Sequence, residues 1–340
     1  MRRNRGFTLV ELLVVIGIIA MIISILLPTL NTARGMARSL KSAANLRSIG
    51  QAMQMYLQTS RQTYPAAYIY EGMSVSGGTQ LPAKADYGHR HISSFLYGTE
   101  KISRVTGETY GLGQNGHIPG TEAFKNPQLE SGGLPPTNPA TNNLDAGQKN
   151  ETVGIVDFQA PRIGYVFNEA ICPRNKFTPG FQGTTNLYHF VRSAAVRNSS
   201  NVIPATEICS DWQVVSGADR ASGSAQVCKS HRPIHAFTAN RCGAGDANLN
   251  MELSDPAKPY YRARYEDLMT NVAKDYTPAA SKSRLDWVGR YTGAGGWEKR
   301  KTNFLYIDGH VETKHIKDTL DDNWQWGERM YTQTNKDAER

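Results

Sequence analysis

Acidic residues are absent from two stretches near the N-terminus of this 340-residue chain. Residues 1–6 contain three arginines and residues 31–61 contain five basic side chains, and neither stretch has an aspartate or a glutamate. Because these stretches hold most of the formal net charge of +8, the residues after 61 sum to only +1. Nucleic-acid binding needs a basic surface or stripe, so the nearly neutral remainder predicts no nucleic-acid partner.

Common catalytic motifs are absent as well, since the sequence has no G-x-S-x-G, no H-E-x-x-H and no phosphate-binding loop. Residues 111–116 match G-x-G-x-x-G, but no apolar strand precedes them and Pro119 follows. Residues 246–250 begin like a calcium loop, but Met251 occupies the position that requires glycine. We therefore expect no enzyme, no catalytic residue, no metal and no cofactor.

One long apolar run is present, and it lies at the N-terminus. Nearly every position of residues 7–30 is apolar. As a helix this run would be about 36 Å long at ~1.5 Å per residue, which is enough to span a bilayer. A secretory signal has a shorter apolar core with its cleavage site behind it, whereas here the small residue Gly6 lies in front. Cleavage after Gly6 would leave the whole apolar helix on the mature protein.

Glu11 is the one charged residue of the apolar run. A carboxylate in a membrane-spanning segment costs on the order of 2–3 kcal/mol or more, so we expect it to have a partner. The nearest candidate is the α-amino group that cleavage before Phe7 would create, on the same chain or on a neighbouring subunit.

The string G-F-T-L-V-E at residues 6–11 resembles the prepilin processing motif of type IV pilins and type II secretion pseudopilins. The resemblance implies cleavage between Gly6 and Phe7 by prepilin peptidase, followed by N-methylation of Phe7. It also implies that Glu11 pairs with the Phe7 amine of an adjacent subunit during assembly. Arginines flank the apolar run on both sides, so only the resemblance places the leader in the cytoplasm and the rest of the chain outside.

A second helical pattern follows the apolar run. No proline intervenes between Pro28 and Pro65, and apolar residues recur at three- and four-residue steps, which predicts an amphipathic stem helix over residues 31–62. The stripe consists of Ala33, Met36, Ala37, Leu40, Ala43, Ala44, Ile49, Met53, Tyr56 and Leu57. We expect its second half to pack on a sheet, and we expect Pro28 to bend the helix because it removes one backbone hydrogen bond.

Residues 63–340 contain short apolar runs separated by turns, which predict an antiparallel sheet. The strand candidates are residues 155–156, 163–167, 194–196, 214–215 and 303–307. Residues 261–274 favour a short helix, and residues 105–150 favour a long loop or insertion.

The sequence around Asp308-Gly309 predicts a two-residue hairpin in which both central residues need a positive φ. The string F-L-Y-I-D-G-H-V, which ends at residue 311 and includes His310, resembles the C-terminal motif of a large group of pilin-like proteins from planctomycete-type bacteria. That group usually has a histidine ten residues before the aspartate, where this chain has Glu298. We expect Asp308 and Gly309 to form the turn and His310 to lie on a strand surface.

All four cysteines, Cys172, Cys209, Cys228 and Cys242, lie in the predicted external head. An even count outside the cytoplasm favours disulfides, and of the 3 possible pairings we prefer Cys228 with Cys242 and Cys172 with Cys209. The alternative is a zinc site formed by Cys228, His231, His235 and Cys242, but their spacing matches no common zinc finger.

Together these patterns predict an α+β protein in which a long N-terminal helix packs on an antiparallel sheet with long loops. The expected organisation is a leader (1–6), a transmembrane helix (7–30), a stem helix (31–62) and an extracytoplasmic head (63–340). The expected function is that of a filament subunit, anchored in the inner membrane by one span and assembling with other pilin or pseudopilin subunits. The alternative is a membrane-anchored binding or enzymatic domain that does not polymerise.

Overall fold

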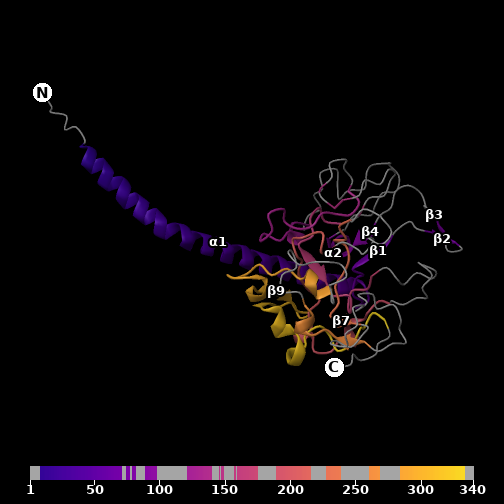
Figure 1. Ribbon diagram of the computed structural model, residues 1–340. Coiled ribbons are helices and arrows are strands. Elements are labelled where there is room, and N and C mark those ends of the chain that lie inside the picture. Colours follow the sequence, from indigo (N-terminus) through magenta and orange to yellow (C-terminus); the bar gives the residue numbers. More distant parts are fainter. Residues whose placement is uncertain are drawn as a thin grey trace.

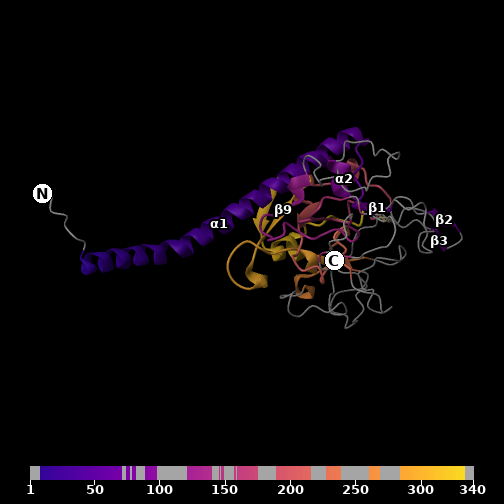
Figure 2. The same ribbon diagram turned by 90° about the horizontal axis from the view of Figure 1, so that it is seen from above.

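The computed structural model describes residues 8–70, 74–76, 79–81, 89–97, 121–139, 145, 147–148, 157, 159–174, 189–215, 227–238, 260–268 and 284–333. A single long helix, α1 (Leu9–Thr59), extends from a head built of short strands and helical turns (Figure 1). The first half of α1 projects away from the head, and its second half lies along it (Figure 2). The predicted long N-terminal helix is therefore confirmed.

In the described ranges, the head combines one further α-helix, α2 (Ile92–Tyr97), with short antiparallel strands. The strands are β1 (Tyr68–Tyr70), β2 (Ser74–Ser76), β3 (Thr79–Leu81), β4 (His89–His91), β5 (Tyr165–Phe167), β6 (Ala205–Glu207), β7 (Phe237–Thr238), β8 (Tyr261–Arg262), β9 (Thr302–Leu305) and β10 (Val311–Lys314). Single 3₁₀ turns are η1 (Thr121–Phe124), η3 (Ser193–Ala195), η4 (Ser199–Asn201), η6 (Tyr265–Asp267), η7 (Arg284–Trp287), η8 (Trp297–Lys299), η9 (Ile316–Thr319) and η10 (Asp321–Asn323).

The central sheet has four strands in the order β10-β9-β6-β5, all of them antiparallel to their neighbours. Strands β5, β6 and β9 are buried along their whole length, because α1 covers one face of the sheet and a second apolar core covers the other. Successive residues therefore enter different cores: Phe304 points into the second core and Leu305 into the core under α1. The predicted α+β fold, with the helix on an antiparallel sheet, is confirmed.

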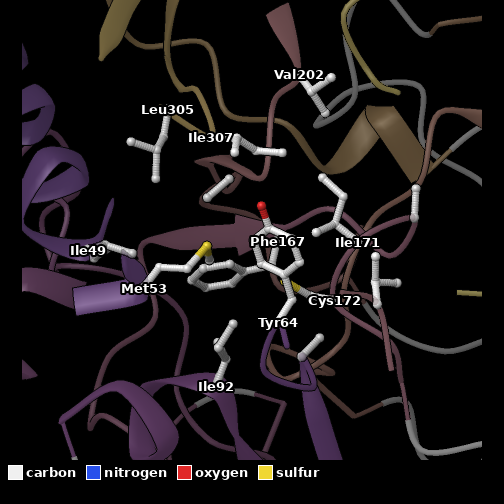
Figure 3. Packing of buried hydrophobic residues seen from close by; sticks show 14 of the residues in the cluster. Ile49, Met53, Tyr64, Ile92, Phe167, Ile171, Cys172, Val202, Leu305 and Ile307 are labelled. Atoms are coloured by element: carbon white, nitrogen blue, oxygen red, sulfur yellow. The ribbon is translucent and has the colours of Figure 1, made fainter. Parts of the chain in front are cut away.

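The core under α1 joins the helix to the sheet and to the segment that follows the helix. Ile49 and Met53 of α1 lie beside Phe167 of β5 and Leu305 of β9, and Tyr64 extends the cluster (Figure 3). All five side chains are almost completely buried. Burying a side chain of this size stabilises a fold by roughly 1.5–3 kcal/mol, so this cluster fixes the helix on the head.

Several strand and helix predictions for the head differ from the structure. Residues 163–167 and 303–307 do contain β5 and β9, whereas residues 194–196 lie in and after η3 and residues 214–215 form a turn. Residues 261–268 form β8 and η6 instead of the start of a helix, and residues 155–156 lie outside the described ranges. Val214 and Val215 are apolar because they fill the second core, and a short apolar pair cannot by itself distinguish a strand from a buried turn.

The predicted β9–β10 hairpin is present, but the predicted two-residue turn is wrong. The Tyr306 N–H donates to the His310 carbonyl and the Gly309 N–H donates to the Tyr306 carbonyl, each at 2.9 Å. The loop therefore has three residues, and among them only Gly309 has a positive φ, of 94°. A type I turn followed by a left-handed glycine is the usual three-residue solution. Asp308 supports it by accepting the His310 N–H at 3.1 Å.

Buried His91 is expected to make the head sensitive to acid. Burial lowers the pKa of His91 to about 3, and its Nδ1 accepts the Ser93 N–H at 3.2 Å, as a neutral ring does. Because the pKa of His91 in the folded protein lies below the unfolded value of about 6.5, the unfolded chain binds a proton more readily than the folded protein does. The protein therefore has its full stability above about pH 6.5 and loses stability as the pH falls toward the pKa of the folded state.

We expect His91→Asn, whose side-chain oxygen can still accept the Ser93 N–H, to flatten the loss of stability between about pH 6.5 and pH 4. Denaturant unfolding of the full chain in detergent at several pH values measures this slope. Equal slopes in the variant and the parent would contradict the assignment of the acid sensitivity to His91.

Candidate assembly surface and stem–head junction

The first half of α1 has no protein around it. Every large apolar side chain from Leu9 to Leu30 is at least 45% exposed, and a Cβ added at Gly17 would meet no atom within 4 Å. This part of α1 is long and apolar enough to cross a membrane. An apolar surface of this extent needs a lipid or protein environment, because soluble proteins rarely expose large contiguous apolar patches.

Glu11 lies in the first turn of α1 and caps the helix. The Glu11 Oε2 accepts the Thr8 N–H at 2.9 Å and the Thr8 hydroxyl at 2.7 Å, and Thr8 Oγ1 accepts the Glu11 N–H at 3.3 Å. This reciprocal arrangement is a capping box, which satisfies helix N–H groups that have no intrahelical partner. The Thr-x-x-Glu spacing could have predicted it from the sequence. The carboxylate thus contacts Thr8, the residue that follows Phe7 in the sequence. Gly6 and Phe7 themselves lie outside the described residues.

Pro28 lies inside α1, and the helix continues through it. A proline has no N–H, so the carbonyl four residues earlier loses its usual donor. Nearby hydroxyls bind backbone carbonyls: Thr29 Oγ1 donates to the Leu26 carbonyl at 2.8 Å and Thr32 Oγ1 to the Pro28 carbonyl at 3.1 Å. α1 bends before it reaches the head (Figures 1 and 2), and the assignment of this bend to Pro28 remains a prediction.

The head covers only part of the apolar stripe that was predicted for the stem. The residues of α1 that the head covers are Ser39, Ser42, Ala43, Asn45, Leu46, Ile49, Gly50, Ala52, Met53 and Leu57. The first part of the predicted stripe is exposed, with Met36 at 67% and Leu40 at 69%. The packing prediction is right for Ala43, Ile49, Met53 and Leu57, which the head covers. It is wrong for Ala44, which is exposed, and Tyr56 is half-buried. Two apolar faces follow one another along the stem, and only one of them meets the head.

A buried carboxylate joins the stem to the sheet. Glu207, at the end of β6, is 0% exposed. Its Oε1 accepts hydrogen bonds from Ser42 Oγ at 2.5 Å and Gln128 Nε2 at 2.7 Å. Asn303 donates its Nδ2 to the same oxygen at 3.0 Å and its backbone N–H to Oε2 at 3.2 Å, and the Thr302 hydroxyl donates to Oε2 at 2.9 Å. Burial raises the pKa of Glu207, and these hydrogen bonds oppose that shift.

Further polar contacts extend this junction along the helix. Ser39 Oγ and Thr292 Oγ1 are 2.8 Å apart, and Asn45 Nδ2 donates to the Lys125 carbonyl at 2.8 Å. Ser39, Ser42 and Asn45 are spaced by three residues, so they lie along one side of α1. The stem is thus held by a polar seam at residues 39–45 and by the apolar core beyond it.

The C-terminal hairpin packs against α1 at Gly50. A Cβ added there would lie 2.9 Å from Leu305 Cδ1 and 3.7 Å from Gly309 Cα, and Gln54 Nε2 donates to the Ile307 carbonyl at 2.7 Å. The side chain of His310 is 39% exposed, and its ring stacks on Tyr306 with the centroids 4.2 Å apart. The geometry makes Asp308 and Gly309 turn formers and places His310 on the hairpin surface.

The preferred disulfide between Cys172 and Cys209 is absent from the structure. Cys172, Cys209 and Cys228 are free, buried thiols, and Cys172 lies in the core under α1 whereas Cys209 lies in the second core. Burial raises the pKa of Cys228 to about 12, so its reactive thiolate form is suppressed at neutral pH. Cys242 lies outside the described residues.

The two histidines of the alternative zinc site contact different partners. His235 Nδ1 lies 2.6 Å from the Phe237 carbonyl, and His231 packs edge-on against Tyr68. In the described part of the chain, no group of three His, Cys, Asp or Glu side chains is arranged to hold a metal ion.

The comparison with known proteins gives one match, which lies in the N-terminal segment. Residues 1–27 match the family model described as the prokaryotic N-terminal methylation motif. No curated protein and no solved structure matches the chain. The matched segment covers residues 1–6, Glu11 and the apolar half of α1 up to the residue before Pro28. The motif supports a type IV pilin-like protein that is processed at its N-terminus, and the apolar helix is consistent with membrane anchoring.

Proposed function

We propose that this protein is a subunit of a filament of the type IV pilus or type II secretion pseudopilus class. The observation that carries the proposal is the coincidence of two features in one segment. The methylation motif of residues 1–27 coincides with the half of α1 that makes no contact with the head. A helix that is processed at its start and bare along an apolar surface is suited first to a bilayer and then to packing with identical helices.

The proposed sequence of events begins with a prepilin in the inner membrane. Prepilin peptidase removes residues 1–6 after Gly6, and Phe7 is N-methylated. Residues 7–30 hold the subunit in the membrane with residues 63–340 in the periplasm. On assembly, the apolar helix leaves the lipid and packs against other subunits, where Glu11 pairs with the Phe7 amine of a neighbour. The head then lies on the outside of the filament.

The assembly surface extends beyond the membrane-spanning half. Met36 and Leu40 are exposed to solvent on the stem, beside the small residues Ala33, Ala37 and Ala44. Residues at three- and four-residue steps lie on one helix face, so these side chains continue the bare apolar surface toward the head. Small residues allow two helices to approach closely.

We expect Leu40→Glu to reduce filament yield strongly while cleavage and membrane insertion remain normal. The residue makes no core contact, so the change should alter the stability of the subunit by less than about 0.5 kcal/mol. In a filament, however, it would bury an unpaired charge between helices, at a cost of several kcal/mol. Filament pelleting and electron microscopy measure the yield.

Phe190→Glu is the matched control, because it places the same charge on an exposed apolar residue of the head. We expect it to assemble. Normal filaments from Leu40→Glu would show that the stem stripe lies outside the assembly surface.

A groove beside the stem supports a second candidate, an anchored binding domain that does not polymerise. It has a volume of about 970 Å³, and its lining includes Lys41 and Asn45 of α1, Tyr97 of α2, Lys125 and Arg162. Substitution of Glu11 distinguishes the two candidate functions. A binding domain would retain its activity without this carboxylate, whereas a filament would not assemble.

A further inference from the structure

An uncovered stretch of helix separates the apolar half of α1 from the head. Residues 31–38 are all exposed, and Ser39 is the first residue of the stem that the head buries. A Cβ added at Gly35 would meet no atom within 4 Å. At ~1.5 Å per residue these eight positions span about 12 Å. With residues 7–30 in the hydrocarbon core, this stretch lies in the headgroup layer and just beyond it.

The uncovered stretch is basic, and no acidic side chain in the described part of the chain pairs with it. Its two charged residues are Arg34 and Arg38. Residues 12–70 contain no aspartate or glutamate, and within the described residues neither arginine takes part in an ion pair. Their spacing of four residues places them on one face, where like charges destabilise a helix slightly. An external anion would remove that repulsion.

We propose that Arg34 and Arg38 bind the phosphates of anionic phospholipids in the leaflet on the head's side of the membrane. Guanidinium groups form paired hydrogen bonds to phosphate oxygens, and basic residues next to a membrane span are attracted to anionic lipid surfaces. The small residues Ala33, Gly35 and Ala37 leave the helix narrow at this depth, so headgroups can reach both arginines. The contact sets how deeply α1 lies and holds the head at the membrane surface.

This inference rests on the membrane-anchoring part of the proposed function and is independent of polymerisation. It also distinguishes this pair from other basic residues near it. Lys41 lies one turn farther along α1 and lines the groove beside the head. Arg47 is exposed on the part of α1 that the head already covers, and Arg61 is exposed after the helix has ended. Of these basic residues of the stem, only Arg34 and Arg38 lie between the apolar segment and the head.

The test uses the full chain in nanodiscs that contain phosphatidylglycerol and phosphatidylcholine, released into native mass spectrometry. The parent protein should retain phosphatidylglycerol in preference to phosphatidylcholine. Arg34→Gln/Arg38→Gln should weaken this preference by roughly fivefold per side chain, whereas the matched control Arg47→Gln/Arg61→Gln should retain it. Excess inorganic phosphate should leave the retention of phosphatidylglycerol unchanged, because the site is formed at the membrane surface.

Several results would overturn the proposal. It fails if the parent shows no lipid preference, if the double variant retains the preference, or if excess inorganic phosphate displaces the lipid. It also fails if the double variant loses self-association while its lipid preference is unchanged, since the partner would then be an acidic surface of a second copy. Flotation with phosphatidylcholine vesicles tests the membrane anchor separately: a parent chain that does not float contradicts the proposed function itself.

Discussion

Replacing Glu11 with leucine is expected to leave the protein in the membrane and to abolish filaments. The change removes a charge that costs on the order of 2–3 kcal/mol in a membrane-spanning segment, so insertion should improve. In a filament, however, the Phe7 amine of the neighbouring subunit would lose its partner. The loss of a charge-assisted contact worth about 1.5–3 kcal/mol per subunit lowers each association constant by about tenfold or more. Over many subunits, that loss prevents growth.

The capping box requires a second variant, because Glu11 also binds Thr8 within its own chain. Glu11→Gln retains an oxygen that can accept the Thr8 N–H, but it has no charge. If the charge pair drives assembly, Glu11→Gln should fail to assemble as Glu11→Leu does, while Thr8→Ala should assemble with a somewhat less stable helix start. Normal filament yield from Glu11→Gln would contradict the charge pair and leave helix capping as the role of Glu11.

The largest expected loss of stability follows from Glu207→Leu. Leucine fills a similar volume but accepts no hydrogen bonds, so five donor contacts from Ser42, Gln128, Thr302 and Asn303 would lose their acceptor. Unsatisfied buried donors cost roughly 1–3 kcal/mol each when they cannot find a new partner. Because two of these donors can rotate, we expect a loss of about 3–5 kcal/mol in the free energy of unfolding.

Denaturant unfolding of the full chain in detergent, followed by tryptophan fluorescence, measures this loss. Glu130→Leu provides the control, because Glu130 is an exposed acid of the same head and should change the stability by less than about 0.5 kcal/mol. If Glu207→Leu is as stable as the control, the polar seam does not hold the stem to the head.

The sequence predicted those features that depend on long, uniform patterns. The apolar run predicted the long helix, and the alternating residues around Asp308 predicted the hairpin formed by β9 and β10. The sheet order β10-β9-β6-β5 joins strands that are far apart in the sequence, and no local pattern specifies such pairings.

The polar seam shows why the stem prediction was only partly right. An apolar stripe was expected to mark the face that meets the head, but Ser42 and Asn45 lie on that face because Glu207 and a backbone carbonyl require donors there. Met36 and Leu40 lie on the other side, uncovered. Hydrophobic periodicity identifies an apolar face without identifying what covers it, and in this protein the apolar face of the first part of the stem is the uncovered one.

If the chain is processed as a prepilin, the N-terminus of the mature protein will show it. The measurement is the intact mass and the N-terminal sequence of the protein extracted from its native membrane. We expect a chain that starts at N-methylated Phe7 and retains the whole of α1. A chain that still starts at Met1, or that starts beyond residue 30, would contradict this processing.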